Sequence, residues 1–476
     1  MIAAAPRDVH RRYSGLRSFH PSVVFVLISF VFGPLVLALV PPMRGPDEAA
    51  HFVRAYAIAR GEILSSTIDA DGRKGALIPQ RLQREMEVFE FALRRTGEPA
   101  FSYRDVFSEY RRIRAELQQE SGAERLVFNL YGGSESYPPV AYLVYLPAIA
   151  IARSAGLDFL GTLYLMRATG FVLTTSAIAV AIAFAGCLQW AFLLIAMLPA
   201  ALYGRAVVSA DGTALALAML TAAVYLQRAC RSQASPWARS ALLTFGALCK
   251  PPQIAFVILE LLKSPSDKNR RALLVAAPAI LLPLVWFWLA GTEVSIWRIA
   301  DSGQFPPESF SPLWRLRLML EHPWHFPRLL FGSFLSCADY GRQIIGVLGS
   351  LDVPLRPFAY PVLTALLLIT ACAAAEVKET ARLRLAVSHA MAALGYCLAV
   401  FLVFYLVWSP LDADRVEGVQ GRYFVVALPF ASVAFSGLLK QGFASQTRAT
   451  AGILGAVIAG SATVEAILRI DWRMIL

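Results

Sequence analysis

The feature that most constrains this chain is a series of long apolar runs that recur along almost its whole length. The first, Val23 to Val40, is long enough to cross a bilayer core of about 30 Å at about 1.5 Å per helical residue. Hydrophobic residues make up 57% of the sequence and charged residues 16%, which is typical of an integral membrane protein. We therefore predict an all-α polytopic membrane protein, with a single membrane domain over residues 23–476 after a short N-terminus at 1–22.

The distribution of basic residues predicts the orientation of the chain. Positive charge precedes the first run, which lacks a small-residue cleavage site, so the run reads as an uncleaved helix with a cytoplasmic N-terminus. The net charge of +11 could suggest a nucleic-acid partner, but the basic residues lie in short clusters between apolar runs. That is the pattern of cytoplasmic loops, so no nucleic acid is expected. The arginines before the first run are Arg7, Arg11, Arg12 and Arg17.

The sequence lacks the motifs of several other classes of protein. The six cysteines are scattered without CxxC spacing, which gives no sign of a disulfide framework or zinc site. The sequence contains no HExxH motif and no Walker-type or dinucleotide-binding glycine loop, which disfavours an energy-coupled pump.

Residues 41–136 form a predicted first outer loop, in which 81–95 and 104–120 have helical spacing. The apolar run at 137–154 then decides the topology. If it spanned the membrane, the later basic clusters would fall outside. We therefore expect it to lie at the outer interface or to form a shallow re-entrant segment.

About eleven transmembrane helices follow from this reading, with residues 291–357 as a second large outer segment. The further spans are expected near residues 163–184, 190–208, 213–226, 272–290, 359–375, 385–407, 423–439 and 453–467. Two runs at 241–249 and 254–262 are too short to cross alone, and Lys250-Pro251-Pro252 separates them. They predict a half-depth hairpin with Lys250 at its buried tip, where it could bind an anionic group or snorkel to the interface.

The stretch from Pro41 to His51 follows directly on the first span. Its three prolines and its glycine prevent regular structure until Asp47, an acceptable N-cap, begins a new helix. Asp47 and Glu48 would then lie at the outer membrane surface, beside His51 and Arg54. The plainer interpretation is that Asp47 only caps the helix and Glu48 only interacts with its dipole.

Further charged residues are expected on the same face. The turn that carries Arg205 and Asp211 would reach the outer side, and Arg422 stands at the outer mouth of the helix that follows it. Polar residues thus gather on one side of the membrane.

These motifs resemble those of the bacterial membrane family catalogued as DUF2142, and they cover nearly the whole chain in order. That family in turn resembles the GT-C superfamily of lipid-sugar-dependent glycosyltransferases. The residues that carry the resemblance are Pro46-Asp47-Glu48, His51, Arg54, Tyr137-Pro138-Pro139, Arg167, Ser209-Ala210-Asp211, Lys250-Pro251-Pro252, Gly349, Asp352, Pro354 and Gly421-Arg422-Tyr423-Phe424.

The resemblance implies a GT-C-like fold and an inverting transferase in the bacterial cytoplasmic membrane, with its active face on the periplasmic or extracellular side. The donor would be a sugar on a polyprenyl phosphate, and the acceptor a cell-envelope glycan, lipid or protein, among membrane lipids. Asp47 would be the base, with Glu48 or Asp211 assisting, and Asp47 and Asp211 could hold a divalent cation. The second outer loop has no DxD motif, so metal dependence stays open.

Cations would stabilise the departing phosphate in such a reaction. The candidates are Arg205, Lys250 and Arg422, and the other substrate-binding candidates are His51, Arg54 and Tyr137. Each also has a structural interpretation: Arg205 could pair with Asp211, and Arg422 could anchor its helix. The alternative functions are a transporter or flippase for lipid-linked sugars, which should place polar residues at mid-membrane, and a non-enzymatic protein of envelope polysaccharide assembly.

Overall fold

The computed structural model describes residues 20–70, 73–96, 101–119, 125–230, 235–262, 269–290, 311–375 and 379–472. Four basic residues of the later clusters lie outside these ranges, as do the four arginines before the first run. They are Arg231, Lys263, Lys268 and Lys378, together with Arg7, Arg11, Arg12 and Arg17. Residues 291–310 of the second outer segment also lie outside the described residues.

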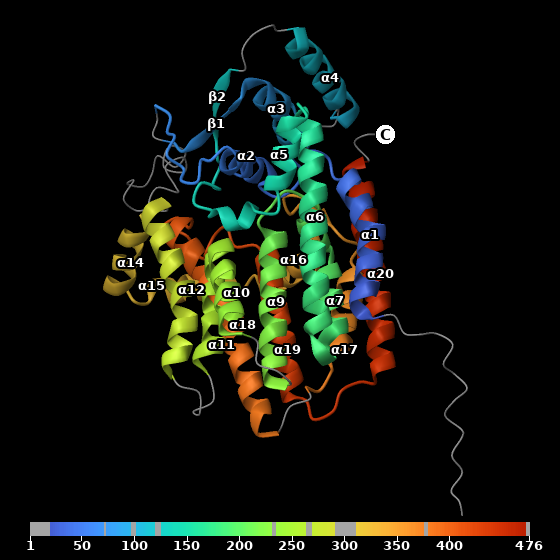
Figure 1. Ribbon diagram of the computed structural model, residues 1–476, viewed down its shortest axis with the longest axis vertical. Helices are drawn as coiled ribbons and strands as arrows, with labels where there is room; N and C mark the ends of the chain where they lie inside the picture. The colour runs from blue at the N-terminus through green and yellow to red at the C-terminus, as the bar shows by residue number, and fades with distance from the viewer. Residues whose placement is uncertain are drawn as a thin grey trace, which may run out of the picture.

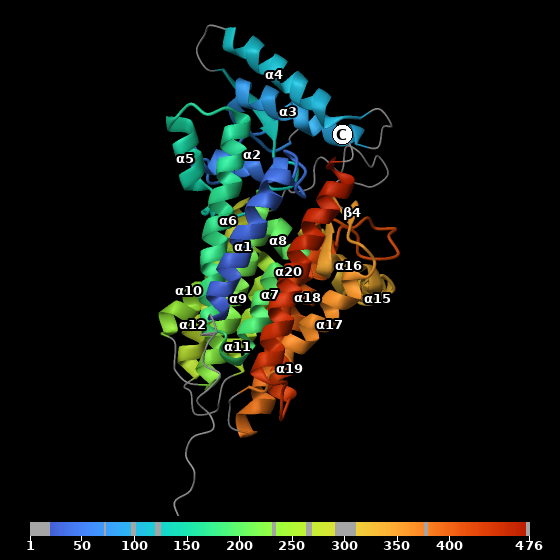
Figure 2. The same ribbon diagram turned by 90° about the vertical axis from the view of Figure 1, so that its right-hand side faces the viewer.

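Long helices running side by side form the body of the molecule (Figures 1 and 2). Six of them, within the described ranges, are long and apolar enough to cross a membrane. A seventh candidate is a bent pair, in which η2 and α7 together (Gly186–Met197) meet α8 (Pro199–Ala206) at 63°. The six are α1 (Pro21–Leu39), α6 (Phe159–Phe184), α12 (Asn269–Ala290), α18 (Glu379–Val407), η5 with α19 (Gly421–Ala427 and Leu428–Leu438) and α20 (Ser445–Ile470).

The structure confirms a mostly helical membrane protein but not the expected eleven spans. The helix α17 (Ala359–Ala371) is shorter than its apolar run suggested. The run at 190–208 breaks at Leu198, which is extended because it precedes Pro199. The helix α9 (Asp211–Cys230) lies among the long helices in Figure 1 but is not among the six.

The predicted break at Lys250 is present. The helix α10 (Pro236–Cys249) ends there, and η3 (Pro251–Val257) and α11 (Ile258–Leu261) follow. Lys250 is extended and buried between these short segments.

The first outer loop forms a cap at one end of the long helices, at the top of Figure 1. It contains α2 (Glu48–Ala59), α3 (Gln80–Arg95) and α4 (Tyr103–Gln119), and the last two match the predicted helical stretches. It also contains two strands that the sequence analysis missed. The strands β1 (Gly75–Pro79) and β2 (Leu126–Leu130) pair antiparallel, with Gly75 opposite Leu130.

The segment at 137–154 forms two short helices, η1 (Pro139–Tyr142) and α5 (Leu146–Ser154). At about 1.5 Å per residue, neither is long enough to cross a bilayer core of about 30 Å. In Figure 2, α5 lies beside the upper end of α6. The interfacial or re-entrant position of this segment and the orientation of the chain stay predictions.

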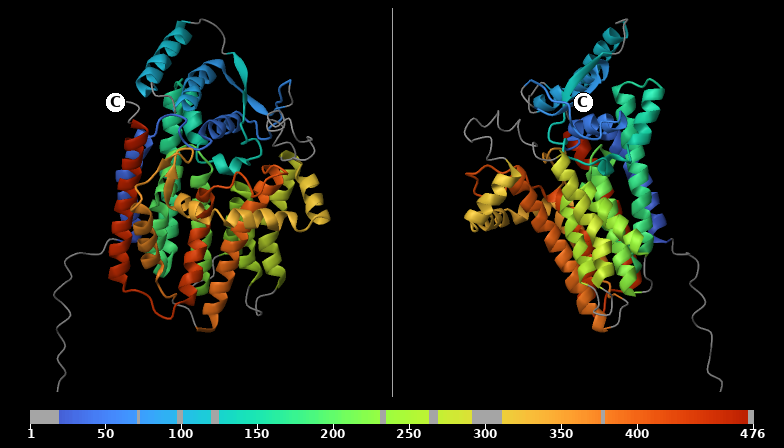
Figure 3. Two further views of the ribbon diagram at one scale, coloured as in Figure 1. Left: turned by 180° about the vertical axis from the view of Figure 1, so that it is seen from behind. Right: turned by 60° about the vertical axis from the view of Figure 1, so that its left-hand side comes forward.

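The described part of the second outer segment contains three helices that lie across the long ones (Figure 3). They are α14 (Pro312–Glu321), α15 (His325–Phe334) and α16 (Cys337–Gly346). A short hairpin of β3 (Val347–Leu348) and β4 (Val353–Pro354) follows, and α16 packs against η5.

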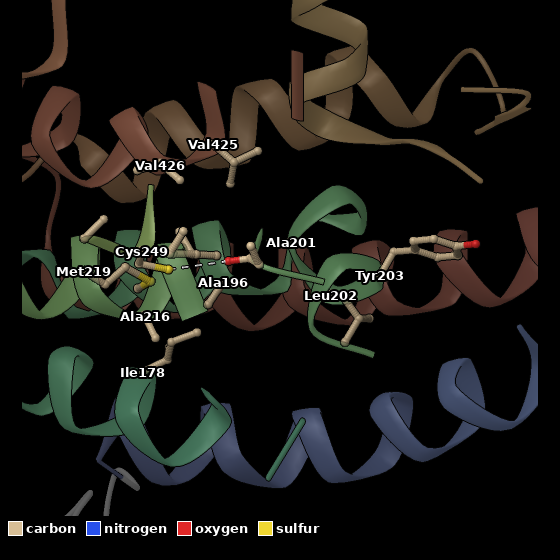
Figure 4. Packing of buried hydrophobic residues seen from close by; sticks show 14 of the residues in the cluster. Ile178, Ala196, Ala201, Leu202, Tyr203, Ala216, Met219, Cys249, Val425 and Val426 are labelled. Atoms are coloured by element: carbon tan, nitrogen blue, oxygen red, sulfur yellow. Dashed lines mark hydrogen bonds between the residues drawn. The ribbon is translucent and has the colours of Figure 1, made fainter. Parts of the chain in front are cut away.

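A core of small and aliphatic side chains joins α6, α8, α9 and η5 (Figure 4). Ala216 and Met219 of α9 are fully or almost fully buried, as is Ile178 of α6. Cys249 and Val425 belong to the same core, and they stand one residue before Lys250 and three residues after Arg422. Packing in this core therefore fixes the backbone beside two charged residues of the candidate site.

Candidate functional site

Asp47 stands in the connection between α1 and α2, and its backbone is strained. It adopts the left-handed conformation (φ 54°, ψ 23°), which is uncommon for a residue other than glycine. The helix α2 begins directly after it, and the His51 N–H donates to the Asp47 carbonyl at 3.0 Å, but the Asp47 side chain makes no capping hydrogen bond. Its carboxylate is 62% exposed. The capping interpretation therefore does not account for this side chain.

The carboxylate of Asp47 instead contacts Arg422, at the start of η5. The Nη2 of Arg422 donates to Asp47 Oδ2 at 3.0 Å. The Nε of the same guanidinium lies 3.8 Å from Asp211 Oδ2, at the start of α9. Arg422 thus bridges two carboxylates that come from segments far apart in the chain.

Lys250 completes this charged cluster. Its ammonium forms an ion pair with Asp211 Oδ1 and lies 4.7 Å from the centre of the Tyr423 ring. Arg422 lies over the same ring at 5.1 Å and donates to the Tyr423 hydroxyl at 3.3 Å. We call Asp47, Asp211, Lys250 and Arg422 the charged cluster. Only Asp47 among them is largely exposed, so the cluster opens to the surface at that residue.

His51 lies one helical turn after Asp47 and is buried. Its Nδ1 is 2.8 Å from the Tyr142 hydroxyl, and its ring packs edge-on against Tyr137. Burial lowers the pKa of His51 to about 4, although Asp47 and Asp211 act in the opposite direction. The imidazole is therefore neutral at pH 7, beside the charged cluster.

Glu48 has a different environment from its neighbour Asp47. Both of its oxygens accept hydrogen bonds from Arg167 of α6, at 2.8 Å and 2.6 Å, and both side chains are fully buried. The two Glu48 oxygens also accept hydrogen bonds from the backbone N–H groups of Gly45 and Val208. The Arg167 guanidinium further donates to two carbonyls at the end of α1. Glu48 therefore fixes the backbone on either side of Asp47, and its oxygens are already occupied.

Arg54 and Tyr137 shape the wall beside His51. The Arg54 guanidinium donates to the carbonyls of Tyr137, Glu62 and Ile63 and lies 5.3 Å from the centre of the Tyr131 ring. Because Arg54 is fully buried, these bonds hold two loop segments together rather than face an open site.

Arg205 does not join the charged cluster and does not pair with Asp211. It points among α1, α6 and α7, where it donates to Thr175 Oγ1 at 2.7 Å and to the Ala196 carbonyl at 3.0 Å. Its guanidinium lies over the rings of Phe25 and Phe171. The bend between α7 and α8 leaves the Ala196 carbonyl available, so Arg205 stabilises that bend.

Sequence reasoning missed the role of Arg44, three residues before Asp47. Its Nε donates to Asp471 Oδ1 at 2.9 Å, and its Nη2 donates to Asp352 Oδ2 at 2.7 Å. It therefore joins the first outer loop to the second outer segment and to the end of α20. Its place in the proline-rich stretch was visible, but no sequence spacing predicts partners so distant.

The two candidate metal ligands do not suit a divalent cation. Asp47 and Asp211 both contact Arg422, and Asp211 also binds Lys250, so positive side chains already neutralise them. Among the described residues, no group of three or more histidine, cysteine, aspartate or glutamate side chains could hold a metal ion.

Comparison with known proteins gives one match. The family model DUF2142, described as a predicted membrane protein, matches residues 30–431 of the 476-residue chain. This range includes every residue of the charged cluster. No curated protein and no solved structure matches the chain.

Proposed function

The chain belongs to the DUF2142 family of predicted membrane proteins, and we propose that it is an inverting glycosyltransferase of the cytoplasmic membrane. It would transfer a sugar from a polyprenyl-phosphate donor to an acceptor hydroxyl at the outer face. The observation that carries this proposal is the contact of Asp47 with Arg422. A strained, exposed carboxylate lies 3.0 Å from a largely buried guanidinium, which in turn neighbours Asp211 and Lys250.

The two cations suit the phosphate of the donor. Arginine binds phosphate oxygens through two parallel N–H donors, and lysine acts as a point charge. The Nε of Arg422 lies 3.8 Å from Asp211 Oδ2 but makes no hydrogen bond within the described residues, so it can donate to a phosphate oxygen without breaking a hydrogen bond. Asp211 would hold Lys250 and Arg422 in position while the donor binds.

Asp47 suits the role of general base. When a phosphate occupies Arg422, the carboxylate of Asp47 is released from the guanidinium and can accept a hydrogen bond from the acceptor hydroxyl. The acceptor oxygen attacks the anomeric carbon opposite the phosphate, and the new carbon–oxygen bond forms as the bond to phosphate oxygen breaks. The electron pair leaves with the phosphate, and the acceptor proton passes to Asp47. This displacement inverts the anomeric centre.

Backbone strain at Asp47 supports its assignment as the general base. Residues in the left-handed region cost about 1–3 kcal/mol each and persist where the surroundings hold them, often at functional sites. Asp47 (φ 54°) and Met43 (φ 62°) both have this conformation, and both lie beside the buried ion pairs of Glu48 and Arg44. The surrounding structure thus holds Asp47 in a conformation that it rarely adopts.

Asp47→Asn tests the proposal. Asparagine tolerates the left-handed conformation and the native side chain makes no capping bond, so folding should be preserved. Loss of the basic oxygen should lower transfer about a hundredfold to ten-thousandfold. The measurement is transfer of labelled sugar from a polyprenyl phosphate by purified protein, with Asp105→Asn, an exposed aspartate of α4, as the matched control. Full activity of Asp47→Asn would refute the assignment of the base.

Lys250→Met tests the donor half of the site. It removes a charge that is costly to bury, and Arg422 still stands 3.8 Å from Asp211, so membrane insertion should be preserved, while affinity for a polyprenyl-phosphate sugar should fall. Lys440→Met, an exposed lysine after α19, is the control. In reconstituted vesicles, movement of intact donor across the bilayer without covalent transfer would instead favour the transporter.

A further inference from the structure

A polar cavity of about 830 Å³ lies between α16, the β3–β4 turn and the loop before η5. Two of its wall residues connect it to the charged cluster. Gln343 accepts the N–H of Gly421, the residue before Arg422, at 2.6 Å. Asp352 on another wall binds Arg44, three residues before Asp47. The cavity therefore borders the backbone that carries both partners of the Asp47–Arg422 contact.

Five exposed charged side chains line the cavity: Asp352, which is paired with Arg44, and four others, Asp339, Arg342, Arg415 and Glu417. Within the described ranges, none of the four forms an ion pair. Arg415 donates to the Ser336 hydroxyl at 3.2 Å, and Arg342 lies over the ring of Tyr360. Arginines and carboxylates are equal in number among these four, so the four together have no net formal charge, and the charge of Asp352 is paired with that of Arg44. A strongly charged occupant would meet repulsion from half of the set.

Sugar hydroxyls match this lining because each hydroxyl both donates and accepts a hydrogen bond. Carboxylates accept from such groups, and guanidinium forks donate to them. Apolar wall residues, Val347, Pro354 and Val419 among them, can contact the C–H faces of a sugar ring. A phosphate would gain from the two arginines but would approach Asp339 and Glu417 at a cost.

We propose that this cavity binds the acceptor, and that the acceptor is a neutral, hydroxyl-rich glycan. This inference rests on the proposed transferase function and adds the substrate class and its binding residues. A glycan held by Asp339, Arg342, Arg415 and Glu417 would present a hydroxyl toward Asp47, while the charged cluster takes the lipid phosphate. The two substrates would thus occupy adjoining sites with different electrostatic character.

Direct binding tests the inference without any lipid-linked donor. Purified full-length protein in detergent is applied to immobilised neutral oligosaccharides of hexoses and N-acetylhexosamines, each beside its sulfated or uronic-acid counterpart. We expect retention on at least one neutral glycan over its charged counterpart. Asp339→Asn and Arg415→Ala should each weaken it roughly tenfold to a hundredfold, because each removes a charged hydrogen-bonding partner. Arg317→Ala, on the 78% exposed Arg317 of α14, should bind as the wild type does.

Preference for the charged glycans, unchanged binding by both cavity variants, or no retention on any neutral glycan would overturn the inference. Failure of the proposed function has a different signature. Neutral-glycan binding that depends on Arg415, with no transfer from any polyprenyl phosphate, would keep the cavity site and reject the transferase. If the protein transfers sugar and neither Asp339→Asn nor Arg415→Ala changes the KM for the acceptor, the transferase function would be kept and the cavity site rejected.

Discussion

The guanidinium of Arg167 binds both carboxylate oxygens of Glu48 in a pair with no solvent exposure, directly beside the exposed Asp47. Adjacent acids in the sequence therefore have opposite environments. Glu48 is tied to α6 and to the turn before α9, while Asp47 faces the surface. This contrast predicts that the two residues respond differently to the same amide substitution.

Glu48→Gln should destabilise the fold rather than remove a chemical step. Breaking a buried ion pair by neutralising one partner typically costs about 3–5 kcal/mol, because the other charge stays buried. We expect a clear fall in the thermal unfolding temperature, measured in detergent, with activity lost in proportion to folded protein. Glu116→Gln, in an exposed pair on α4, should unfold like the wild type. Normal stability with lost activity would give Glu48 a direct chemical role instead.

Gly421→Ala should damage the site without changing any charge. A Cβ at this position would lie 2.4 Å from the Tyr340 carbonyl oxygen and 2.5 Å from Gln343 Cβ, so the backbone before Arg422 must shift. Because Arg422 bridges Asp47 and Asp211, we expect at least a tenfold loss of transfer in protein that still folds. Gly341→Ala in α16 is the matched control, since its Cβ would meet no atom within 4 Å. Equal activity of the two variants would contradict this role for the η5 backbone.

His51 should make stability depend on pH below neutrality. Its pKa is about 4 in the folded protein, below the ordinary value of about 6.5, so the unfolded chain takes up a proton first as pH falls. Stability is therefore lost between about pH 6.5 and pH 4, by at most about 3 kcal/mol. Unfolding temperatures of wild type and His51→Gln, measured from pH 7.5 to pH 4, should diverge in slope, with the variant the flatter. Parallel slopes would mean that His51 is not buried as a neutral ring.

The orientation of the chain can be measured by thiol labelling. In a cysteine-free background, a cysteine at Glu109 of α4 should react with a membrane-impermeant reagent added to intact cells. A cysteine at Gln441, in the exposed turn between α19 and α20, should react only after the membrane is opened. The helix α4 and the connection between α19 and α20 lie at opposite ends of the long helices in Figure 1. The reverse pattern would place the charged cluster on the cytoplasmic side.

Local signals in the sequence predicted several features well. Prolines mark the start of α2 and the break at Lys250, and periodicity marks α3 and α4, because these features depend on nearby residues. The strands β1 and β2 were missed because each is short and gains its pairing from the other. The expected count of about eleven spans was not confirmed, since a long apolar run can contain a break such as that at Pro199.

The sequence did not predict which side chains pair when they are far apart along the chain. Arg205 stands six positions before Asp211, so the sequence made them plausible partners, but packing turns the guanidinium toward Thr175 and Ala196. Arg44 finds Asp352 and Asp471 only in the folded chain. Glu48 and Asp47 could not be separated by sequence, because the difference lies in which one faces Arg167 of α6.

The contact between Asp47 and Arg422 joins positions 375 residues apart, and that between Arg44 and Asp471 joins positions 427 apart. Synthesis at about 5–20 residues per second therefore separates the emergence of Asp47 from that of Arg422 by roughly 20–75 seconds. During that interval the first outer loop is already made, while the cation that contacts its exposed carboxylate does not yet exist. The charged cluster is therefore completed only when the helix that begins at Gly421 has entered the membrane. A chain that stops before that helix would carry an intact Asp47 without its cationic partner, so premature termination late in synthesis would leave the charged cluster incomplete.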